Sequence, residues 1–209
     1  MDETDGSHYE MEAGATISPP LLPDGGLCIL CEGWAALSIT TGFGRQILRI
    51  MLPGDLCSHI FRKRAFSGLS ISALTPVSFF SVKARDLDDL LTRRPDLGTT
   101  LEDGAWDEGK AFATLLSVVG LGSGRERVAY LVLSILSRLG ELPVRKTSYP
   151  FPLRRQDIAA VVGMSEVHVS RVMAEYRDGG IMHLDHRTLY VDNPVALECI
   201  GHVSKSLAK

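Results

Sequence analysis

The side chains at residues 154–180, in the segment RRQDIAAVVGMSEVHVSRVMAEYRDGG, are of types that bind nucleic acid. The planar guanidinium of Arg171 can donate two parallel hydrogen bonds to O6 and N7 of guanine. His168 and Ser170 can bond to a base edge or a phosphate, while Glu166 can accept from N4 of cytosine or favour a helix N-terminus. The segment therefore predicts base contacts by Glu166, Val167, His168, Ser170 and Arg171.

Three further arginines are better suited to phosphates: Arg154, Arg155 and Arg187. Phosphate contacts orient a protein on the duplex without reading its sequence. Residues 142–192 are nearly balanced in charge, with basic residues at 145, 146, 154, 155, 171, 177 and 187 and acidic residues at 157, 166, 175, 178, 185 and 192. One such domain has little net attraction for DNA, so we expect two copies to read half-sites about one helical turn apart.

Two helices joined by a tight turn would position these side chains. A first helix over 155–162 needs the small Ala159 at its crossing, and Gly163 can end it in the left-handed conformation. Ser165 can cap a second helix that buries Val169, Val172 and Met173. Two short strands around Asp185-His186-Arg187 then form a wing. This pattern predicts a winged helix-turn-helix, and a two-helix corner that binds only protein is the alternative.

The first two-thirds of the chain has a different pattern. Residues 1–10 are polar and aperiodic, which predicts a disordered tail. Short apolar runs broken by Gly, Pro and Asp then predict a β-barrel or sandwich over 11–94, the part that the resemblance described below makes an effector domain. A long helix is expected over 95–120 and the DNA-binding domain over 121–209, after the break GLGSG.

The long helix carries an apolar stripe that could serve a partner helix or pack against the chain's own barrel. The stripe alone does not decide between the two; the resemblance described below favours a dimer interface formed by Leu101, Phe112, Leu115, Leu116 and Val119.

The four cysteines do not suggest a metal site. Cys28 and Cys31 form a C-x2-C pair, but they lie in a strand-like run, where their thiols would point to opposite faces. We expect buried structural cysteines rather than a metal or redox pair. The acidic N-terminus and the absence of a signal-peptide layout predict a cytoplasmic protein. The sequence shows neither a nucleophile–base pair nor a glycine-rich phosphate loop, so nothing in it indicates an enzyme. No apolar run is long enough to span a membrane.

Over residues 12–198 the chain resembles the cyclic-AMP receptor protein/fumarate-nitrate regulator (Crp/Fnr) superfamily of bacterial transcription regulators. The matching segments are EGWAALSITTGFGRQILRIMLPGDL, LSISALTPVSFFSV, GSGRERVAYLVLSILSRLG and the helix-turn-helix quoted above. The resemblance implies an α+β chain with an N-terminal cyclic-nucleotide-binding-like β-roll (a jelly roll), a long dimerisation helix and a C-terminal winged helix-turn-helix.

The sequence departs from that of the family's cyclic-nucleotide binders at two places. No Gly-Glu follows the Pro-Gly-Asp at 53–55, and Ser67 and Gly68 stand where an Arg-Ser would hold the phosphate. A buried cyclic phosphate without a cationic partner is costly, so we expect no cyclic AMP. The basic run at 62–64 is expected to be a solvated loop. No iron–sulfur cluster or haem is expected either. The candidate effector pocket comprises Cys57, His59, Ser67 and Ser70.

We therefore expect a homodimeric regulator that binds a palindromic site in double-stranded DNA and recruits or blocks RNA polymerase. One alternative is a regulator without a ligand, controlled by abundance or by thiol oxidation at Cys57; another is a sensor module that acts only through protein contacts. Val167 and His168 stand where many relatives have a Glu before the Ser-Arg pair. This departure favours a half-site different from the family's common one.

Overall fold

A computed structural model describes residues 6–17, 26–57, 68–141, 143 and 147–201. The chain divides into two compact units, Met1–Ala113 and Thr114–Lys209. Each unit is described by itself. Within the described residues, no helix is both long and apolar enough to cross a membrane.

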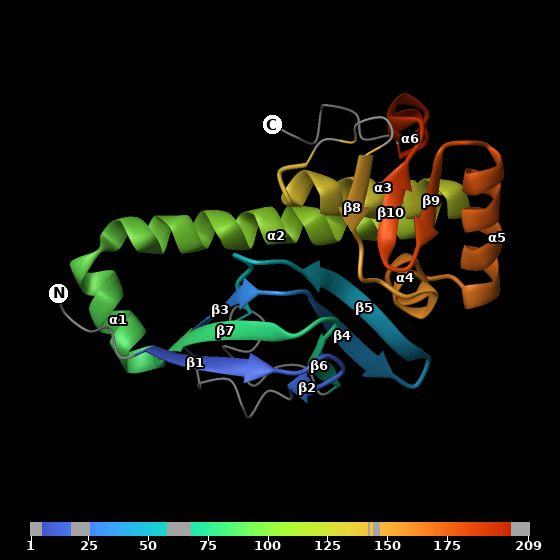
Figure 1. The fold of residues 1–209 in the computed structure, drawn as a ribbon. Coiled ribbons are helices and arrows are strands. Elements are labelled where there is room, and N and C mark those ends of the chain that lie inside the picture. Colours follow the sequence, from blue (N-terminus) through green and yellow to red (C-terminus); the bar gives the residue numbers. More distant parts are fainter. Residues whose placement is uncertain (1–5, 18–25, 58–67, 142, 144–146, 202–209) are drawn as a thin grey trace. The chain divides into compact units, whose positions relative to one another are not determined.

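The first unit is a roll of two antiparallel sheets (Figure 1). One sheet has the order β1-β7-β3, and the other has the order β2-β6-β4-β5. The strands are β1 (Gly6–Met11), β2 (Thr16–Ile17), β3 (Leu27–Glu32), β4 (Ala35–Thr41), β5 (Gly44–Met51), β6 (Leu69–Ala73) and β7 (Val77–Val82). The helices α1 (Ala84–Arg93) and α2 (Pro95–Leu121) follow.

Alternation along the strands builds the core of the roll. On β6, Leu69, Ile71 and Ala73 are buried, while the serines between them face the other side of the sheet. The core cluster also takes residues from β3, β4, β5 and β7, including Leu30, Leu37, Met51, Val77 and Phe79. The predicted β-rich fold of the first part of the chain is therefore present.

Residues 6–10 differ from the predicted disordered tail, and residues 1–5 lie outside the described residues. Gly6–Met11 form β1, which pairs with β7 from Gly6↔Val82 to Met11↔Val77. The polar side chains of this strand remain largely exposed. A strand neighbour supplies main-chain hydrogen bonds whatever the side chains are, so polarity alone was a poor guide to disorder here.

The second unit is built on α3 (Gly124–Arg138). Ser123 and Glu126 cap it reciprocally: the N–H of Glu126 donates to Ser123 Oγ (3.3 Å), and the N–H of Ser123 donates to Glu126 Oε2 (2.6 Å). The remaining elements are β8 (Thr147–Pro150), α4 (Arg155–Val162), α5 (Glu166–Asp178), β9 (Met182–Asp185), β10 (Thr188–Val191) and α6 (Pro194–Gly201). The three strands form a sheet of order β8-β10-β9.

The division between the units differs from the predicted one. The helix break expected at 120–124 is present, since α2 ends at Leu121 and α3 begins at Gly124. The two compact units nevertheless divide between Ala113 and Thr114, inside α2. The last two turns of α2 therefore belong to the second unit, because they pack within it.

Candidate DNA interface

The turn between α4 and α5 has the predicted local geometry. Gly163 adopts φ 64° and ψ 44°, the left-handed conformation that residues with a Cβ adopt only at a cost. Its neighbour closes the end of α4, since the N–H of Met164 donates to the carbonyl of Ala159 (3.1 Å). Ser165 begins α5, and its hydroxyl accepts from the N–H of His168 (3.2 Å). The bounds predicted for the first helix, 155–162, are confirmed.

Buried contacts attach this pair of helices to α3. Val169, Val172 and Met173 are buried, as predicted. Tyr176 is fully buried, its hydroxyl donates to the carbonyl of Arg125 (2.6 Å), and burial raises its pKa to about 12. Arg127 donates to the carbonyls of Gly122 (2.9 Å) and Val162 (3.3 Å).

Sequence reasoning missed these anchors, although a tyrosine on the apolar side of α5 was a signal, since a buried phenol needs a partner.

The exposed face of α5 carries Val167 and Arg171, one turn apart. Val167 is 81% exposed, which is unusual for an apolar residue on a helix whose other face is fully buried. Glu166 is also exposed, and Ser170 is half-buried at the edge of this face. The structure therefore brings four of the five predicted base-contact residues together on the N-terminal half of α5.

His168 is placed differently. It is half-buried, and a Cβ added to Gly124 would lie 2.9 Å from its Nε2 and 3.1 Å from Cε of Met164. The imidazole therefore packs toward the start of α3 rather than with Val167 and Arg171. The residue's type suggested DNA contact, but the glycine at 124 leaves room for the ring inside the unit.

The wing lies close to the start of α4. Strands β9 and β10 pair from Met182↔Val191 to Asp185↔Thr188, leaving His186 and Arg187 as a two-residue turn. Both have positive φ, 42° and 65°. The N–H of Phe151 donates to the carbonyl of Arg187 (2.8 Å), which ties this turn to the chain just before Arg154.

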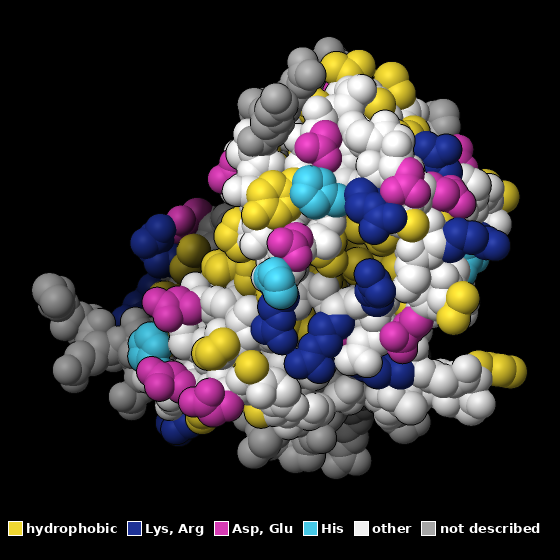
Figure 2. Space-filling model, turned by 45° about the vertical axis from the view of Figure 1, so that its right-hand side comes forward, with side chains coloured by type: hydrophobic (Ala, Val, Ile, Leu, Met, Phe, Trp, Pro, Cys, Tyr) yellow, Lys and Arg dark blue, Asp and Glu magenta, His cyan; other side chains and the backbone are white. Residues whose placement is uncertain are grey.

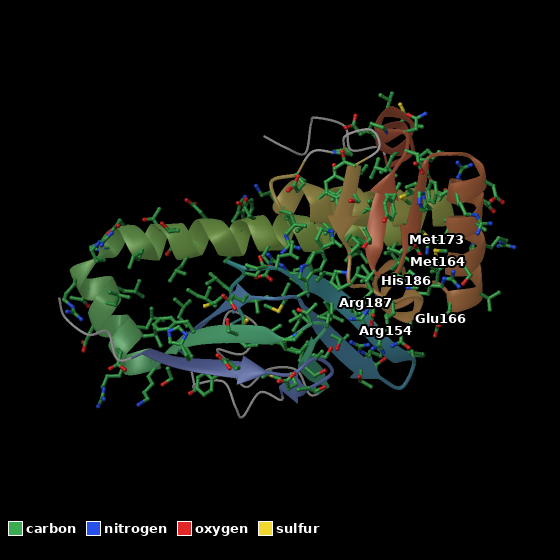
Figure 3. All side chains as sticks on the ribbon, in the orientation of Figure 1. Arg154, Met164, Glu166, Met173, His186 and Arg187 are labelled. Atoms are coloured by element: carbon green, nitrogen blue, oxygen red, sulfur yellow. The ribbon has the colours of Figure 1, made fainter. Side chains whose placement is uncertain are left out.

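Arg154, His186 and Arg187 consequently group at one end of the unit, with Glu166 at the start of α5 (Figure 3). Arg155 is exposed in the first turn of α4, so all three predicted phosphate contacts face solvent. His186 was not among the predicted contacts, and its side chain is 95% exposed.

Charge on this side of the molecule is mixed. Figure 2, in which the side carrying α5 comes forward, shows Lys and Arg side chains interspersed with Asp and Glu. Within the second unit, Arg177 Nη2 and Asp178 Oδ1 form an ion pair (3.0 Å). The surface therefore lacks the uniform positive charge that would hold DNA without regard to sequence.

The two described residues of the predicted effector pocket, Cys57 and Ser70, do not lie together in the roll. Cys57 is 1% exposed in the core cluster. Ser70 lies between the core residues Leu69 and Ile71, so it faces the opposite side of the sheet, where its hydroxyl contacts that of Ser38 (3.2 Å). Strand alternation separates the two residues. His59, Ser67 and the basic run at 62–64 lie outside the described residues.

The C-x2-C pair is divided between the two faces of β3, as predicted. Cys28 is buried, as expected, but Cys31 is exposed, so the expectation of buried structural cysteines is wrong for Cys31. Among the residues that the structure describes, no group of three His, Cys, Asp or Glu side chains could hold a metal ion.

Helix α2 carries two apolar stripes, of which sequence reasoning identified one. The predicted stripe is half-buried for the most part: Phe112 packs against the core of the roll, and Val119 lies near Gly163, where an added Cβ would be 3.2 Å from its Cγ1. Of the predicted set, Leu116 is exposed, at 74%. Phe112 and Val119 therefore correspond to the alternative of packing within the chain.

The other stripe, which we call the outer stripe, repeats at alternating spacings of three and four and is exposed throughout: Trp106, Gly109, Ala113, Leu116 and Gly120.

Comparisons with known proteins agree with this geometry. A family model, the Crp-like helix-turn-helix domain, matches residues 126–200. Transcriptional activator protein FnrL of Cereibacter sphaeroides is 25% identical over 158 residues, covering 73% of this chain and 63% of that protein. Nitrogen fixation regulation protein FixK of Bradyrhizobium diazoefficiens is 27% identical over 158 residues, covering 75% and 65%. The chain thus spans less than two thirds of the length of these two relatives.

Solved structures share the fold along nearly the whole chain. FixK2 from Bradyrhizobium japonicum has a TM-score of 0.78 at 21% identity, covering 95% of this chain and 98% of that one. A CooA mutant from Carboxydothermus hydrogenoformans has a TM-score of 0.76 at 16% identity, covering 94% and 88%.

Proposed function

We propose, from the premise that this chain belongs to the Crp/Fnr superfamily of transcription regulators, that it binds double-stranded DNA as a homodimer and regulates transcription through α5. The observation that carries the proposal is the exposed face of α5, where Arg171 and Val167 stand on a helix held by buried contacts on its other side. A rigid helix with exposed side chains in its first turns is what major-groove reading requires.

The proposed division of labour follows the chemistry of the side chains. Arg171 reads guanine through two parallel hydrogen bonds, and Val167 offers an apolar surface to a thymine methyl group. Arg187 in the wing turn and Arg154 near it bind phosphates on the flanking backbone, and Arg155 does the same from the first turn of α4. A palindromic operator follows if two copies bind one duplex.

The outer stripe of α2 supports the homodimer. Its spacings of three and four are those of a coiled-coil seam, and Gly109, Ala113 and Gly120 would allow two helices to approach closely. Trp106 is 72% exposed and Leu116 is 74% exposed in the single chain, so a partner helix would remove a large apolar area from water.

The roll supports regulation without cyclic AMP. Gly68, which stands where the family's cyclic-nucleotide binders carry a serine for the phosphate, has φ +94°, and a Cβ there would collide with the carbonyl oxygen of Thr40. A side chain at this position would need a different backbone. Calorimetry that detects micromolar cyclic-AMP binding would overturn this part of the proposal. Recruitment or exclusion of RNA polymerase is the expected outcome of DNA binding.

The test begins with selection of the preferred duplex from a random-sequence pool by the full-length protein. Fluorescence anisotropy then measures affinity at two salt concentrations for the wild type, Arg171→Ala and Arg171→Lys. We expect the alanine variant to lose about 1–3 kcal/mol on the selected duplex, because both guanine bonds are lost. The lysine variant should keep the charge and lose sequence preference.

Arg177→Ala is the matched control, since Arg177 lies in the last turn of α5 and pairs with Asp178. It should bind like the wild type. Equal affinity for selected and random duplexes, or affinity that does not change with salt, would contradict the proposal.

A further inference from the structure

Two buried thiols face each other in the core of the roll. Cys28 on β3 is 2% exposed, Cys57 is 1% exposed, and both belong to one core cluster. The N–H of Cys57 donates to the carbonyl of Cys28 (2.7 Å), beside the antiparallel bridge Ile29↔Leu56. In that register Cys28 and Cys57 are direct cross-strand neighbours on the same side, where Cβ atoms lie about 4.5–5.5 Å apart.

The two thiols also interact directly. A hydrogen bond from the Cys57 thiol lowers the pKa of Cys28, and the same bond together with burial raises the pKa of Cys57. Cys28 is therefore the sulfur that ionises first, and the thiolate is the form that reacts with oxidants. Cys57 is placed to attack whatever forms on Cys28.

The Cys57 segment is linked to α2 through one arginine. Asp55, two residues before Cys57, accepts from Arg49 Nη2 (2.8 Å) and from the N–H of Leu52 (2.8 Å). The other terminal nitrogen of Arg49 donates to Glu108 on α2 (2.7 Å). The Arg49 and Asp55 side chains are only 21% and 13% exposed, and that of Glu108 is 10% exposed. A displacement of this segment would therefore move Arg49 and, through it, Glu108 on α2, because both ion pairs are largely shielded from water.

We propose that Cys28 and Cys57 form a reversible intramolecular disulfide when the protein meets a hydroperoxide, and that this oxidation alters DNA binding through Asp55, Arg49 and Glu108. A disulfide needs Cβ atoms about 3.5–4.5 Å apart, less than the usual cross-strand spacing. Closing the bond therefore draws the Asp55–Cys57 segment toward β3.

The reaction balances with hydrogen peroxide as the oxidant. The Cys28 thiolate attacks one peroxide oxygen, the O–O bond breaks, and hydroxide leaves with a sulfenic acid on Cys28. The Cys57 sulfur then attacks the Cys28 sulfur, the S–O bond breaks, and hydroxide leaves again. The two thiol protons convert both hydroxides to water, so two thiols are oxidised while one peroxide becomes two waters.

Peptide mapping of the full-length protein under non-reducing conditions tests the bond. After stoichiometric hydrogen peroxide, we expect a cross-linked peptide pair containing Cys28 and Cys57, which disappears on treatment with dithiothreitol. Cys31→Ser is the matched control, because Cys31 is the exposed cysteine of the same strand, and it should still form the cross-link. Cys28→Ala and Cys57→Ala should not form it.

The consequence is measured by anisotropy on the selected duplex before and after oxidation. We expect a change of about fivefold or more in affinity for the wild type and Cys31→Ser, reversed by dithiothreitol, and no change for either alanine variant. Circular dichroism checks that each protein remains folded.

Cross-links through Cys31 or Cys199, irreversible oxidation of Cys28 without a cross-link, or a cross-link that leaves affinity unchanged would overturn the proposal. The mapping needs no DNA, so loss of the bond and loss of DNA binding are separate failures.

Discussion

Helices α5 and α2 both expose apolar side chains, but their opposite faces differ. Four residues of α5 are buried within its own unit, namely Val169, Val172, Met173 and Tyr176. No residue of α2 is buried, although it is the longest helix of the described chain, with 27 residues. The apolar surface of α5 is thus a single side chain, Val167, on a helix that is already anchored. That of α2 is a whole exposed stripe, which is consistent with the homodimer proposed above.

The largest expected effect comes from disrupting the proposed dimer contact of α2, which should leave α5 unchanged. Leu116→Arg places a charge in the middle of the outer stripe, so it should weaken the dimer by about 100-fold or more, equivalent to about 2.7 kcal/mol. Sedimentation equilibrium over a concentration series measures it. Ala111→Arg makes the same kind of change at an exposed site on the other side of α2 and should leave the dimer intact. Equal dissociation of both variants would show that the outer stripe is not the interface.

A smaller effect is expected from the anchor of α5. Tyr176→Phe removes the hydrogen bond to the carbonyl of Arg125 and leaves that oxygen short of a donor, so unfolding free energy should fall by about 1–3 kcal/mol. Urea denaturation at neutral pH measures the change. If this variant lost dimerisation while its unfolding free energy stayed unchanged, the result would contradict a purely anchoring role of Tyr176 within its own unit.

The same tyrosine predicts an alkaline dependence. Its pKa is raised to about 12 in the folded state by burial, so the folded protein holds its proton longer than the unfolded chain, whose phenol titrates near pH 10. The stabilisation is complete below about pH 10 and is lost as pH rises toward about 12. Tyr176→Phe should lack this contribution, and the difference in unfolding free energy between the two proteins should shrink across that range. A constant difference would contradict a buried, protonated phenol.

The smallest effect concerns the exposed apolar residue of α5. If Val167 contacts a thymine methyl, replacing that thymine by uracil in the selected duplex should weaken binding by about 0.8 kcal/mol, roughly fourfold. Val167→Ala should be insensitive to the same replacement. Anisotropy on duplexes carrying one uracil at a time identifies the position. If no thymine position responds, Val167 faces the groove without reading it.

The first helix and the turn of the helix-turn-helix could be predicted to the residue, because their sequence signals are local. Gly163 permits a left-handed turn, Ser165 caps the next helix, and the apolar spacing selects the buried face; each depends on neighbours within a few residues. The wing was predictable for the same reason, since two short strands met at Asp185-His186-Arg187.

The structure places some residues differently from the sequence-based expectation, because their positions depend on distant residues. His168 has the chemistry of a DNA contact, yet Gly124, far away in the sequence, leaves space that takes its ring. Cys57 and Ser70 were grouped by the family's pattern, but strand alternation divides them between two faces. Phe112 joined the predicted dimer stripe because a helix shows only its periodicity, and periodicity does not say which apolar stripe meets the roll.

The sequence by itself determined the fold class, the order of the domains and the turn and buried faces of the helix-turn-helix. Backbone conformation and side-chain period are encoded over short distances. Only the tertiary structure decided which stripe of α2 stays exposed, where His168 packs and that Cys28 faces Cys57. Each of these contacts joins residues that are far apart in the sequence and meet only on folding. Strand register and core packing select the partners, and neither can be read from a short segment.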